Sequence, residues 1–353
     1  MADRLAIAPA DEALTFARAE IDGRHRLILV SAYENGGVSG VDLTAALEPA
    51  MDDPIDAYAA HGYDGLAAFA SAGGEQVSVP LAQLALPVRL AGLHIATGTN
   101  FPEHAQESTV KDGPFLFPKD VQPTPFDAAV SAGGGLLDYE AELCFVTLAD
   151  VDLETAPERA GLLLCNDYTD RARLMRHVDP RDITSGKGFT TGKSAPGFLP
   201  VGNLFVIPRD LRAFAASVEL RLYRNGEIRQ SARQSEAIWD FDEVLRQTRG
   251  RKATLWAHEG REVGLPIESG RIPARTGILG GTPEGTIFQG VKPATMMRGF
   301  LDWIAGGWSR PPTHWVIERY VAQATAARRY LQPGERVRIA VERLGEIDNR
   351  IVD

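Results

Sequence analysis

The sequence has 353 residues, of which 44% are hydrophobic and 24% are charged, and its formal net charge is −10 at pH 7. This length allows one large domain and a smaller one, and the composition is typical of a globular protein. The excess of acidic residues argues against nucleic acid as a partner.

Neither a membrane protein nor a secreted one is indicated. No apolar stretch reaches the roughly 18–20 residues of a membrane span, and the N-terminal residues lack the apolar run of a signal peptide. Both cysteines, Cys144 and Cys165, lie in apolar stretches. We expect them to be small buried side chains with free thiols in a reducing compartment. The prediction is therefore a cytoplasmic protein with no membrane partner.

The N-terminal part shows strand and helix patterns. Thr15–Ala32 is interpreted as a β-hairpin around Asp22-Gly23. Helices are predicted near Val41–Met51 and Ile55–Ser71. Val79–Val88 contains two prolines and is interpreted as a connector.

The stretch Leu136–Thr147 contains two interleaved registers of opposite polarity. Successive side chains of a strand point to opposite faces. One register is apolar and can pack into a core: Tyr139, Ala141, Leu143 and Phe145. The other begins acidic and ends apolar: Asp138, Glu140, Glu142, Cys144 and Val146. A half-exposed surface strand would explain the carboxylates, but the apolar continuation indicates a face that becomes buried. Carboxylates about 6–7 Å apart along a strand can converge on one cation, and oxygen ligands favour Mg²⁺, Ca²⁺ or Mn²⁺ over Zn²⁺.

A second segment ends in another carboxylate. The apolar run Leu162–Cys165 precedes Asn166-Asp167. Its length is consistent with a strand buried on both faces, although a helical segment is not excluded by periodicity. Asp167 would then lie where the strand ends. An ordinary turn or helix-capping aspartate is the alternative.

The C-terminal half contains further strand and helix signals. Ser217–Gln230 alternates in polarity and contains Asn225-Gly226, which is typical of a two-residue hairpin turn. Alternation over 337–341 predicts another strand. Helices are expected at Ser235–Thr248 and Trp315–Tyr330.

Six motifs follow one another between residues 90 and 345. They are G-x-N-F-x-x-H-x-x-E (98–107), D-Y-E-x-E-L (138–143), N-D-x-T-x-R (166–171), K-S-x-x-G-F-x-P-V-G (193–202), G-T-P-E-G (281–285) and L-x-P-G-E-x-V-x-I-x-V-E-x-L-G (331–345). In type and order they resemble the fumarylacetoacetate hydrolase superfamily. Collinear motifs are more specific than any one of them alone.

The resemblance implies an α+β, mainly β fold. It would be a mixed β-roll of the fumarylacetoacetate hydrolase C-terminal type over residues 89–353, in a homodimer, preceded by a small N-terminal domain over residues 1–88. Residues 287–329, with three tryptophans, would be an insertion relative to compact members. An extra helical layer is the expected role of this insertion. The alternative is an aromatic wall beside the pocket, or a dimer contact.

By the same resemblance, Glu140, Glu142 and Asp167 are metal ligands. Mg²⁺ is the expected ion, with Mn²⁺ and Ca²⁺ as alternatives, and open positions would remain for water and a bidentate substrate. Some members carry a further aspartate where this chain has Thr97. Asp138 fits the pattern, but we expect it to support the site without binding the metal.

His104 and Glu107 match the water-activating pair of the hydrolytic members. Three residues apart on a helical turn they share a face, and the carboxylate can orient the imidazole and stabilise its protonated form. A surface-loop histidine is the alternative. Lys193 matches the lysine that stabilises developing negative charge. The nearby Arg181 and Lys187 lack the motif that surrounds Lys193.

Three residues are predicted to bind substrate or to orient the site. The guanidinium of Arg171 would donate to a ligand carboxylate or a substrate oxygen, with a structural salt bridge to Asp170 or Asp167 as the alternative. Gly281 and Thr282 would present a backbone amide and a hydroxyl to the substrate carboxylate.

The expected function is metal-dependent hydrolysis of a carbon–carbon bond in a 1,3-dicarbonyl acid of the acylpyruvate or fumarylacetoacetate type. The partner would thus be a small-molecule keto acid. Two alternatives remain at this point. One is a metal-dependent lyase of a 2-keto acid, acting as a dehydratase or hydratase, or as a decarboxylase or isomerase. The other is a binding protein that retains only the fold.

Overall fold

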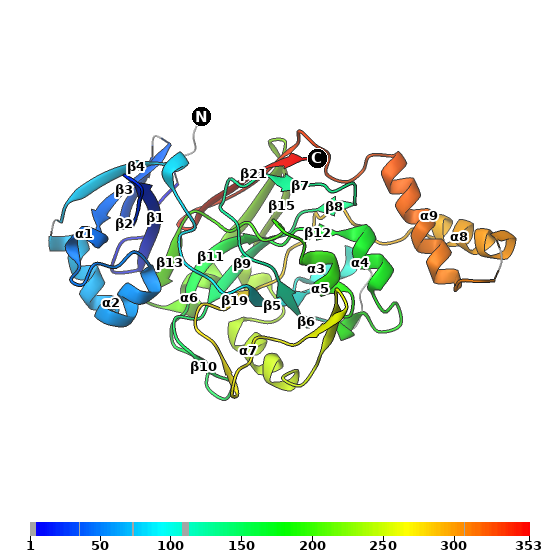
Figure 1. The fold of residues 1–353 in the computed structure, drawn as a ribbon, viewed down its shortest axis with the longest axis horizontal. Helices are drawn as coiled ribbons and strands as arrows, with labels where there is room; N and C mark the ends of the chain where they lie inside the picture. Colours follow the sequence, from blue (N-terminus) through cyan, green and yellow to red (C-terminus); the bar gives the residue numbers. More distant parts are fainter. Residues whose placement is uncertain (1–4, 35, 73, 108–112, 307) are drawn as a thin grey trace.

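The computed structural model describes residues 5–34, 36–72, 74–107, 113–306 and 308–353 (Figure 1). Its largest sheet has the strand order β4-β3-β2-β1-β13-β11-β9-β19-β5-β6. Within it β19 and β5 run parallel, whereas the other neighbours are antiparallel, so the predicted mixed, mainly β architecture is confirmed. The strands are β1 (Ala13–Ile21), β2 (Arg24–Glu34), β3 (Gly37–Asp42), β4 (Gln76–Pro80), β5 (Leu93–Gly98), β6 (Phe115–Asp120), β9 (Ala141–Val146), β11 (Gly161–Asn166), β13 (Phe205–Pro208) and β19 (Gly277–Leu279).

The N-terminal strands form one end of this sheet. β1 pairs with β13 from Ala13 opposite Pro208 to Phe16 opposite Phe205. Backbone hydrogen bonds therefore join the first strands to the rest of the molecule, at the left of Figure 1. A domain boundary at residue 88 stays a prediction.

The hairpin and one of the two helices predicted for this region are confirmed, and the other helix is shorter than predicted. The hairpin of β1 and β2 is confirmed, and both turn residues have positive φ, 51° for Asp22 and 70° for Gly23, as a primed two-residue turn requires. The helix α2 (Pro54–Ala72) also agrees with the prediction. The helix predicted over 41–51 is reduced to α1 (Leu43–Ala46). Val41 still pairs in the sheet, and Pro49 cannot continue a helix.

The central strands carry the two registers read from the sequence. β9 and β11 pair antiparallel, with Glu142 opposite Cys165 and Leu143 opposite Leu164, and every residue of both strands is buried. The predicted strand over 136–147 is split, because β8 (Leu137–Asp138) pairs separately with β12 (Thr169–Asp170). The apolar register packs into one core cluster, and Cys144 packs into a second on the opposite face. Both predicted faces are thus confirmed.

A second sheet of five strands has the order β15-β14-β20-β21-β7. Its hairpin turns at Asn225-Gly226, as predicted. The following helix begins at Phe241 rather than Ser235, because Asp240 accepts a hydrogen bond from the amide of Glu243 and caps it. The elements are β7 (Val130–Ser131), β14 (Glu219–Arg224), β15 (Glu227–Arg233), β20 (Arg336–Val341), β21 (Gly345–Val352) and α7 (Phe241–Gly250).

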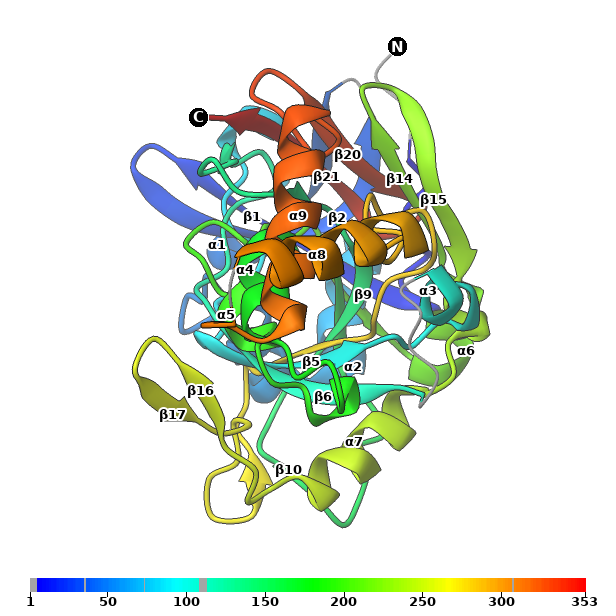
Figure 2. The ribbon, with the colours of Figure 1, turned by 90° about the vertical axis from the view of Figure 1, so that its right-hand side faces the viewer.

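Residues 287–329 contain a helical hairpin that extends from the body of the molecule (Figure 1). It consists of α8 (Pro293–Gly306) and α9 (Pro312–Ala326), and α9 contacts α4 (Arg171–His177), as Figure 2 shows. The two helices cross closely at Gly299, where a Cβ atom would lie 2.5 Å from the Cα of Val316. An added helical layer is therefore observed.

Two further pairs of short strands form two-stranded sheets, β10 (Val151–Asp152) with β18 (Arg271–Ile272) and β16 (Trp256–His258) with β17 (Arg261–Val263). Three further short helices are α3 (Pro102–Glu107), α5 (Phe189–Lys193) and α6 (Leu211–Ser217). Among the described helices, none is both long and apolar enough to cross a membrane.

Candidate functional site

Three buried carboxylates converge at the ends of β9 and β11. Glu140 precedes β9, Glu142 lies within it, and Asp167 follows β11 directly. One oxygen from each lies within 4.8 Å of the others. The amide of Asp167 donates to the carbonyl of Glu140 (2.9 Å), which fixes the two strand ends against each other. The structure therefore brings together the three residues predicted to bind metal.

The electrostatics of this cluster show that it is crowded with negative charge. Burial, followed by the neighbouring Asp167 and Glu140, raises the pKa of Glu142 well above its usual value. Burial also opposes ionisation of Glu140, but Lys193 and Arg171 outweigh it and lower the pKa of Glu140 to about 2. A cation at this position would stabilise the ionised form of Glu142.

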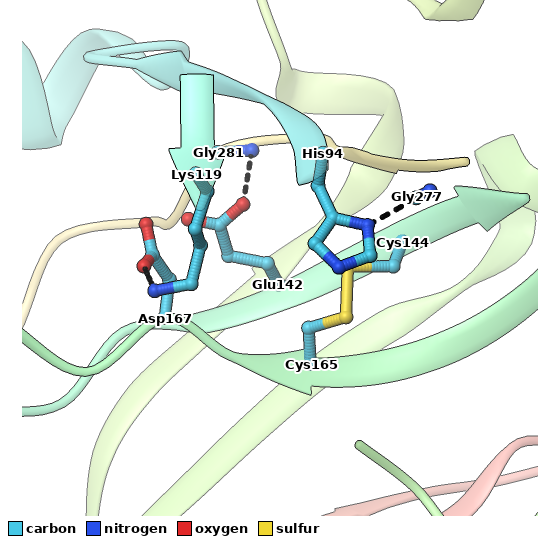
Figure 3. Close-up of a disulfide and its surroundings, with 8 residues drawn as sticks. All are labelled: His94, Lys119, Glu142, Cys144, Cys165, Asp167, Gly277 and Gly281. Atoms are coloured by element: carbon cyan, nitrogen blue, oxygen red, sulfur yellow. Dashed lines mark hydrogen bonds and ion pairs between the residues drawn. A yellow bond between two sulfur atoms is a disulfide. The ribbon is translucent and has the colours of Figure 1, made fainter. Parts of the chain in front are cut away.

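Two lysines enclose the carboxylates, and only one of them was predicted. Lys193 donates from Nζ to Oε2 of Glu140 (2.6 Å) and to Oδ2 of Asp167 (2.8 Å). Lys119, near the end of β6, donates to Oδ1 of Asp167 (2.5 Å), as Figure 3 shows. It also donates to the carbonyl of Lys193 (2.6 Å). Burial lowers the pKa of Lys119, against the attraction of Asp167.

Arg171 orients Glu140 from the side opposite Lys193. Its Nη2 donates to Oε1 of Glu140 (2.6 Å), and its Nε donates to Oδ2 of Asp138 (2.8 Å). Asp138 also accepts from the amides of Ile287 (2.9 Å) and Phe288 (3.1 Å). The contact of Arg171 with a ligand carboxylate was predicted. Its second partner is Asp138, not Asp170 or Asp167, and Asp138 supports the site from outside the cluster as expected.

His104 and Glu107 lie together on α3. Nδ1 of His104 is 3.6 Å from Oε2 of Glu107, and His104 is buried beside the carboxylate cluster. Glu107 is held from its other side by the amide of Gly285, at 3.1 Å from both carboxylate oxygens. The shared helical face predicted from their spacing is confirmed, and the surface-loop alternative for His104 is wrong.

Gly281 and Thr282 are placed differently from the prediction. The amide of Gly281 donates to Oε2 of Glu142 (2.7 Å), so it holds a carboxylate of the cluster rather than facing a substrate (Figure 3). The hydroxyl of Thr282 donates to the carbonyl of Ala141 (3.0 Å) and accepts from Nε2 of Gln230 (2.9 Å). Gly281 has φ of 83°, and a Cβ there would lie 2.6 Å from that of Asn100, which explains the glycine.

The cysteines form a disulfide, which corrects the expectation of free thiols. Cys144 and Cys165 are diagonal neighbours across β9 and β11, and their sulfur atoms are bonded (Figure 3). Side chains at such diagonal positions come within reach of each other. The sequence showed only that both residues are buried, and the register between the strands decides that they meet.

A cavity of about 710 Å³ opens beside the cluster. At its inner end it is lined by His104, Glu140, Arg171 and Lys193, together with Thr282. Its remaining walls include residues of α4, α8 and α9. Two of the predicted catalytic residues, His104 and Lys193, and one of the three carboxylates, Glu140, thus face one common space, and Glu107 lies beside His104.

The residues present fit a divalent cation. Their donors are carboxylate oxygens, which hard cations prefer. The raised pKa of Glu142 shows that the neighbouring cations do not fully offset the negative charges of this cluster. Within the described residues, this trio is the group of acidic, histidine or cysteine side chains whose ligand atoms approach closely enough to hold an ion.

Lys119 and Gln230 are the site residues that sequence reasoning missed. Lys119 directly follows the apolar run Phe115–Pro118, and a lysine in such a strand was a signal of a buried ion pair. Gln230 accepts from the amide of Ala141 (2.9 Å) and donates to the carbonyl of Pro283 (2.8 Å). Its position in the middle of the hairpin strand β15 gave no comparable signal.

Comparison with known proteins places this geometry in a family. The model of the fumarylacetoacetate (FAA) hydrolase C-terminal domain matches residues 94–352. A search among curated proteins found no match. Among solved structures, the fumarylacetoacetate hydrolase of psychrophilic Exiguobacterium antarcticum is similar, with 21% identity, a TM-score of 0.58 and coverage of 96% of this chain and 99% of that one.

Two isomerases have similar structures. The 2-hydroxyhepta-2,4-diene-1,7-dioate isomerase of Mycobacterium marinum has 16% identity and a TM-score of 0.54, covering 96% of this chain and 98% of that one. The 5-carboxymethyl-2-hydroxymuconate delta-isomerase of Mycobacterium smegmatis has 18% identity and a TM-score of 0.55, covering 96% and 99%. At these identities the likeness establishes a common fold and no common substrate. Because the family model spans most of its length, the chain belongs to the fumarylacetoacetate hydrolase family.

Proposed function

We propose that this protein is a metal-dependent hydrolase that cleaves a carbon–carbon bond in an acylpyruvate-type 1,3-dicarbonyl acid. The observation that carries the proposal is that His104, Glu140 and Lys193 line one cavity, while Glu107 lies beside His104, and Glu142 and Asp167 lie beside Glu140. In the reaction, water adds to the distal carbonyl and the bond between that carbon and the central methylene breaks. The products are a carboxylic acid and pyruvate.

Glu140, Glu142 and Asp167 would hold Mg²⁺, or Mn²⁺ or Ca²⁺ in its place. The ion when bound would supply Lewis-acid chemistry to the keto acid. Lys193, whose ammonium lies 2.6 Å from Glu140, would stabilise negative charge that develops on the pyruvate half. Arg171 would keep Glu140 in its orientation through their 2.6 Å hydrogen bond.

His104 would take a proton from the attacking water and return it to the carbon of the leaving pyruvate unit. Glu107 would orient the imidazole and stabilise its protonated form. The amide of Gly285 holds Glu107 in place on α3. This pair favours hydrolysis over the lyase alternatives, because those reactions need no activated water at a distal carbonyl.

A homodimer and a small keto-acid partner complete the proposal. Cytoplasmic residence belongs to it as well. The Cys144–Cys165 disulfide opposes that location, because disulfides persist mainly in oxidising compartments.

The proposal is tested by product stoichiometry with acetylpyruvate and the Mg²⁺- or Mn²⁺-loaded protein. Hydrolysis yields one acetate per pyruvate, with one oxygen of acetate derived from ¹⁸O-labelled water. His104→Ala should keep the metal and lose at least ~10²-fold in turnover. Release of carbon dioxide or water in place of acetate would assign the lyase class, and full hydrolysis by the His104 variant would remove the assigned mechanism.

A further inference from the structure

We infer that the substrate carries an extended apolar acyl chain, and that the helical hairpin of α8 and α9 forms the groove that receives it. This inference rests on the proposed function and names the substrate class within it. The substituent on the distal carbonyl would be a hydrocarbon chain of medium length, not a second carboxylate.

The size of the cavity is the first observation. At about 710 Å³ it falls in the range of pockets that enclose drug-sized ligands. A short acylpyruvate such as acetylpyruvate would occupy only the inner end, near Lys193 and Arg171. The remaining space calls for a larger substrate.

The chemistry of the walls is the second observation. The ionisable side chains among the described lining residues are His104, Glu140, Arg171 and Lys193, all at the inner end. Both cations there are already bonded to carboxylates of the site. Within the described part of the cavity, the distal end of a dicarboxylate would therefore find no cation.

Two apolar walls begin beside the charged residues. On one side, the ring of Phe117 lies 5.9 Å from Nζ of Lys193 and packs against Phe189. On the other, the ring of Phe288 lies 5.4 Å from the guanidinium carbon of Arg171 and makes an edge contact with Tyr320 of α9. On each side, apolar surface therefore begins directly beside a charged group.

The insertion extends the second wall outward. Met297 and Phe300 of α8 line the cavity, although 63% and 44% of their surface is exposed, and Val316 of α9 lines it next to Gly299. Apolar side chains left this exposed on one face generally mark a binding surface. Continuity with the catalytic cavity identifies the occupant as the distal part of the substrate.

The tryptophans of the insertion are not part of this wall. Trp303 and Trp308 contact each other, with ring centroids 4.4 Å apart, and neither lines the cavity. The aromatic side chains with which the insertion lines the cavity are thus Phe288 and Phe300, together with methionine and aliphatic side chains, and not the tryptophans. Such flexible and branched side chains suit a hydrocarbon chain.

The test compares acetylpyruvate, octanoylpyruvate and fumarylpyruvate with the metal-loaded protein. Burial of hydrocarbon predicts a gain in kcat/KM of about threefold per methylene that the groove covers, and at least ~30-fold for octanoylpyruvate over acetylpyruvate. The double variant Met297→Ser/Phe300→Ser should lower this ratio about tenfold.

The matched control is Leu301→Ser/Ile304→Ser. These residues lie on the same helix and are 55% and 49% exposed, but neither lines the cavity. The control pair should leave the ratio unchanged. An equal fall in both double variants would overturn the groove and indicate a general role of α8, such as contact with a second copy of the chain.

The outcomes separate this inference from the proposed function. Hydrolysis of acetylpyruvate or fumarylpyruvate at least as fast as octanoylpyruvate would overturn the apolar-chain inference and leave the hydrolase standing. If none of the three is hydrolysed, the proposed function fails. Calorimetry with the Mn²⁺-loaded protein then decides the groove, since 2-oxodecanoate should bind at least ~30-fold more tightly than pyruvate, and equal affinities would overturn it.

Discussion

The strand pair β9–β11 and the helical hairpin α8–α9 depart from ordinary protein architecture in opposite directions. The strand pair places Glu142 and Asp167 in the interior, where each is about 1% exposed. The hairpin leaves Met297, Phe300 and Leu301 largely exposed. Charged residues are rarely buried and large apolar patches are rarely exposed. Glu140 of the carboxylate cluster and Met297 and Phe300 of the hairpin line one cavity. The comparison therefore teaches that the cost of each departure is tolerated where a ligand is to be bound.

Glu142→Ala gives the largest expected effect, because it removes one of the three converging carboxylates. We expect loss of metal binding in calorimetry with Mg²⁺ or Mn²⁺, and loss of all turnover. Glu107→Gln is the control, since it alters the catalytic pair and should retain the metal. Undiminished metal affinity in Glu142→Ala would show that the buried charges of the strand pair serve another purpose.

Lys119→Met tests whether the buried ion pairs are coupled to stability. It would leave Asp167 buried with one cationic partner fewer, and we expect a loss of about 3–5 kcal/mol in the free energy of unfolding, measured with urea in the presence of EDTA. Lys187→Met is the matched control, because Lys187 is exposed and 3.9 Å from Asp179. Its effect should stay within about 0.5 kcal/mol. Similar losses in the free energy of unfolding in both variants would show that the buried ion pair contributes no more to stability than the exposed one.

His94 adds a pH dependence to the same interior. Burial, followed by the charge of Lys119, lowers its pKa from 6.5 to about 4. Because the unfolded chain binds the proton more tightly, the stabilising contribution is full above pH 6.5 and is lost as the pH falls toward 4. The loss amounts to about 3 kcal/mol between pH 7 and pH 4.

His94→Asn should remove that part of the pH dependence. The asparagine can still accept from the amide of Gly277, which donates to Nδ1 of His94 at 3.1 Å. Urea unfolding at several pH values measures the slope. His25→Asn, at an exposed position of β2, should leave the slope unchanged, and an equal change in both variants would contradict the assignment.

The smallest effect is expected on the exposed hairpin. Leu301→Ser/Ile304→Ser should change the free energy of unfolding by no more than about 0.5 kcal/mol, because neither side chain is buried. A loss of several kcal/mol, measured at two protein concentrations, would show that these residues are covered in solution, and the comparison would have to include a second chain.

Local patterns in the sequence predicted the features that depend on neighbouring residues. The alternation around Glu140 and Glu142 indicated both faces of β9, and the turns at Asp22-Gly23 and Asn225-Gly226 were confirmed. The collinear motifs correctly predicted that the carboxylate trio and His104 lie close together. These successes rest on period-two geometry and on turn chemistry, which act over a few residues.

The features that were missed depend on contacts between distant segments. Lys119 and Asp167 are 48 residues apart, and their contact follows from where β6 ends relative to β11. The pairing of β1 with β13 joins residues that are far apart in the sequence, such as Ala13 and Pro208. The Cys144–Cys165 bond needs the register of two strands. No local periodicity specifies such pairings.

The disulfide makes the chemical history of a preparation relevant to its catalytic centre. Cys144 is two residues from Glu142, and Cys165 is two residues from Asp167, so the bond ties the carboxylate-bearing strand ends into one covalent ring. Protein made in a reducing host and protein oxidised during purification would then be different molecules at this point. Thiol reagents added as routine buffer components would act as effectors, and intact mass under non-reducing conditions belongs beside every activity measurement.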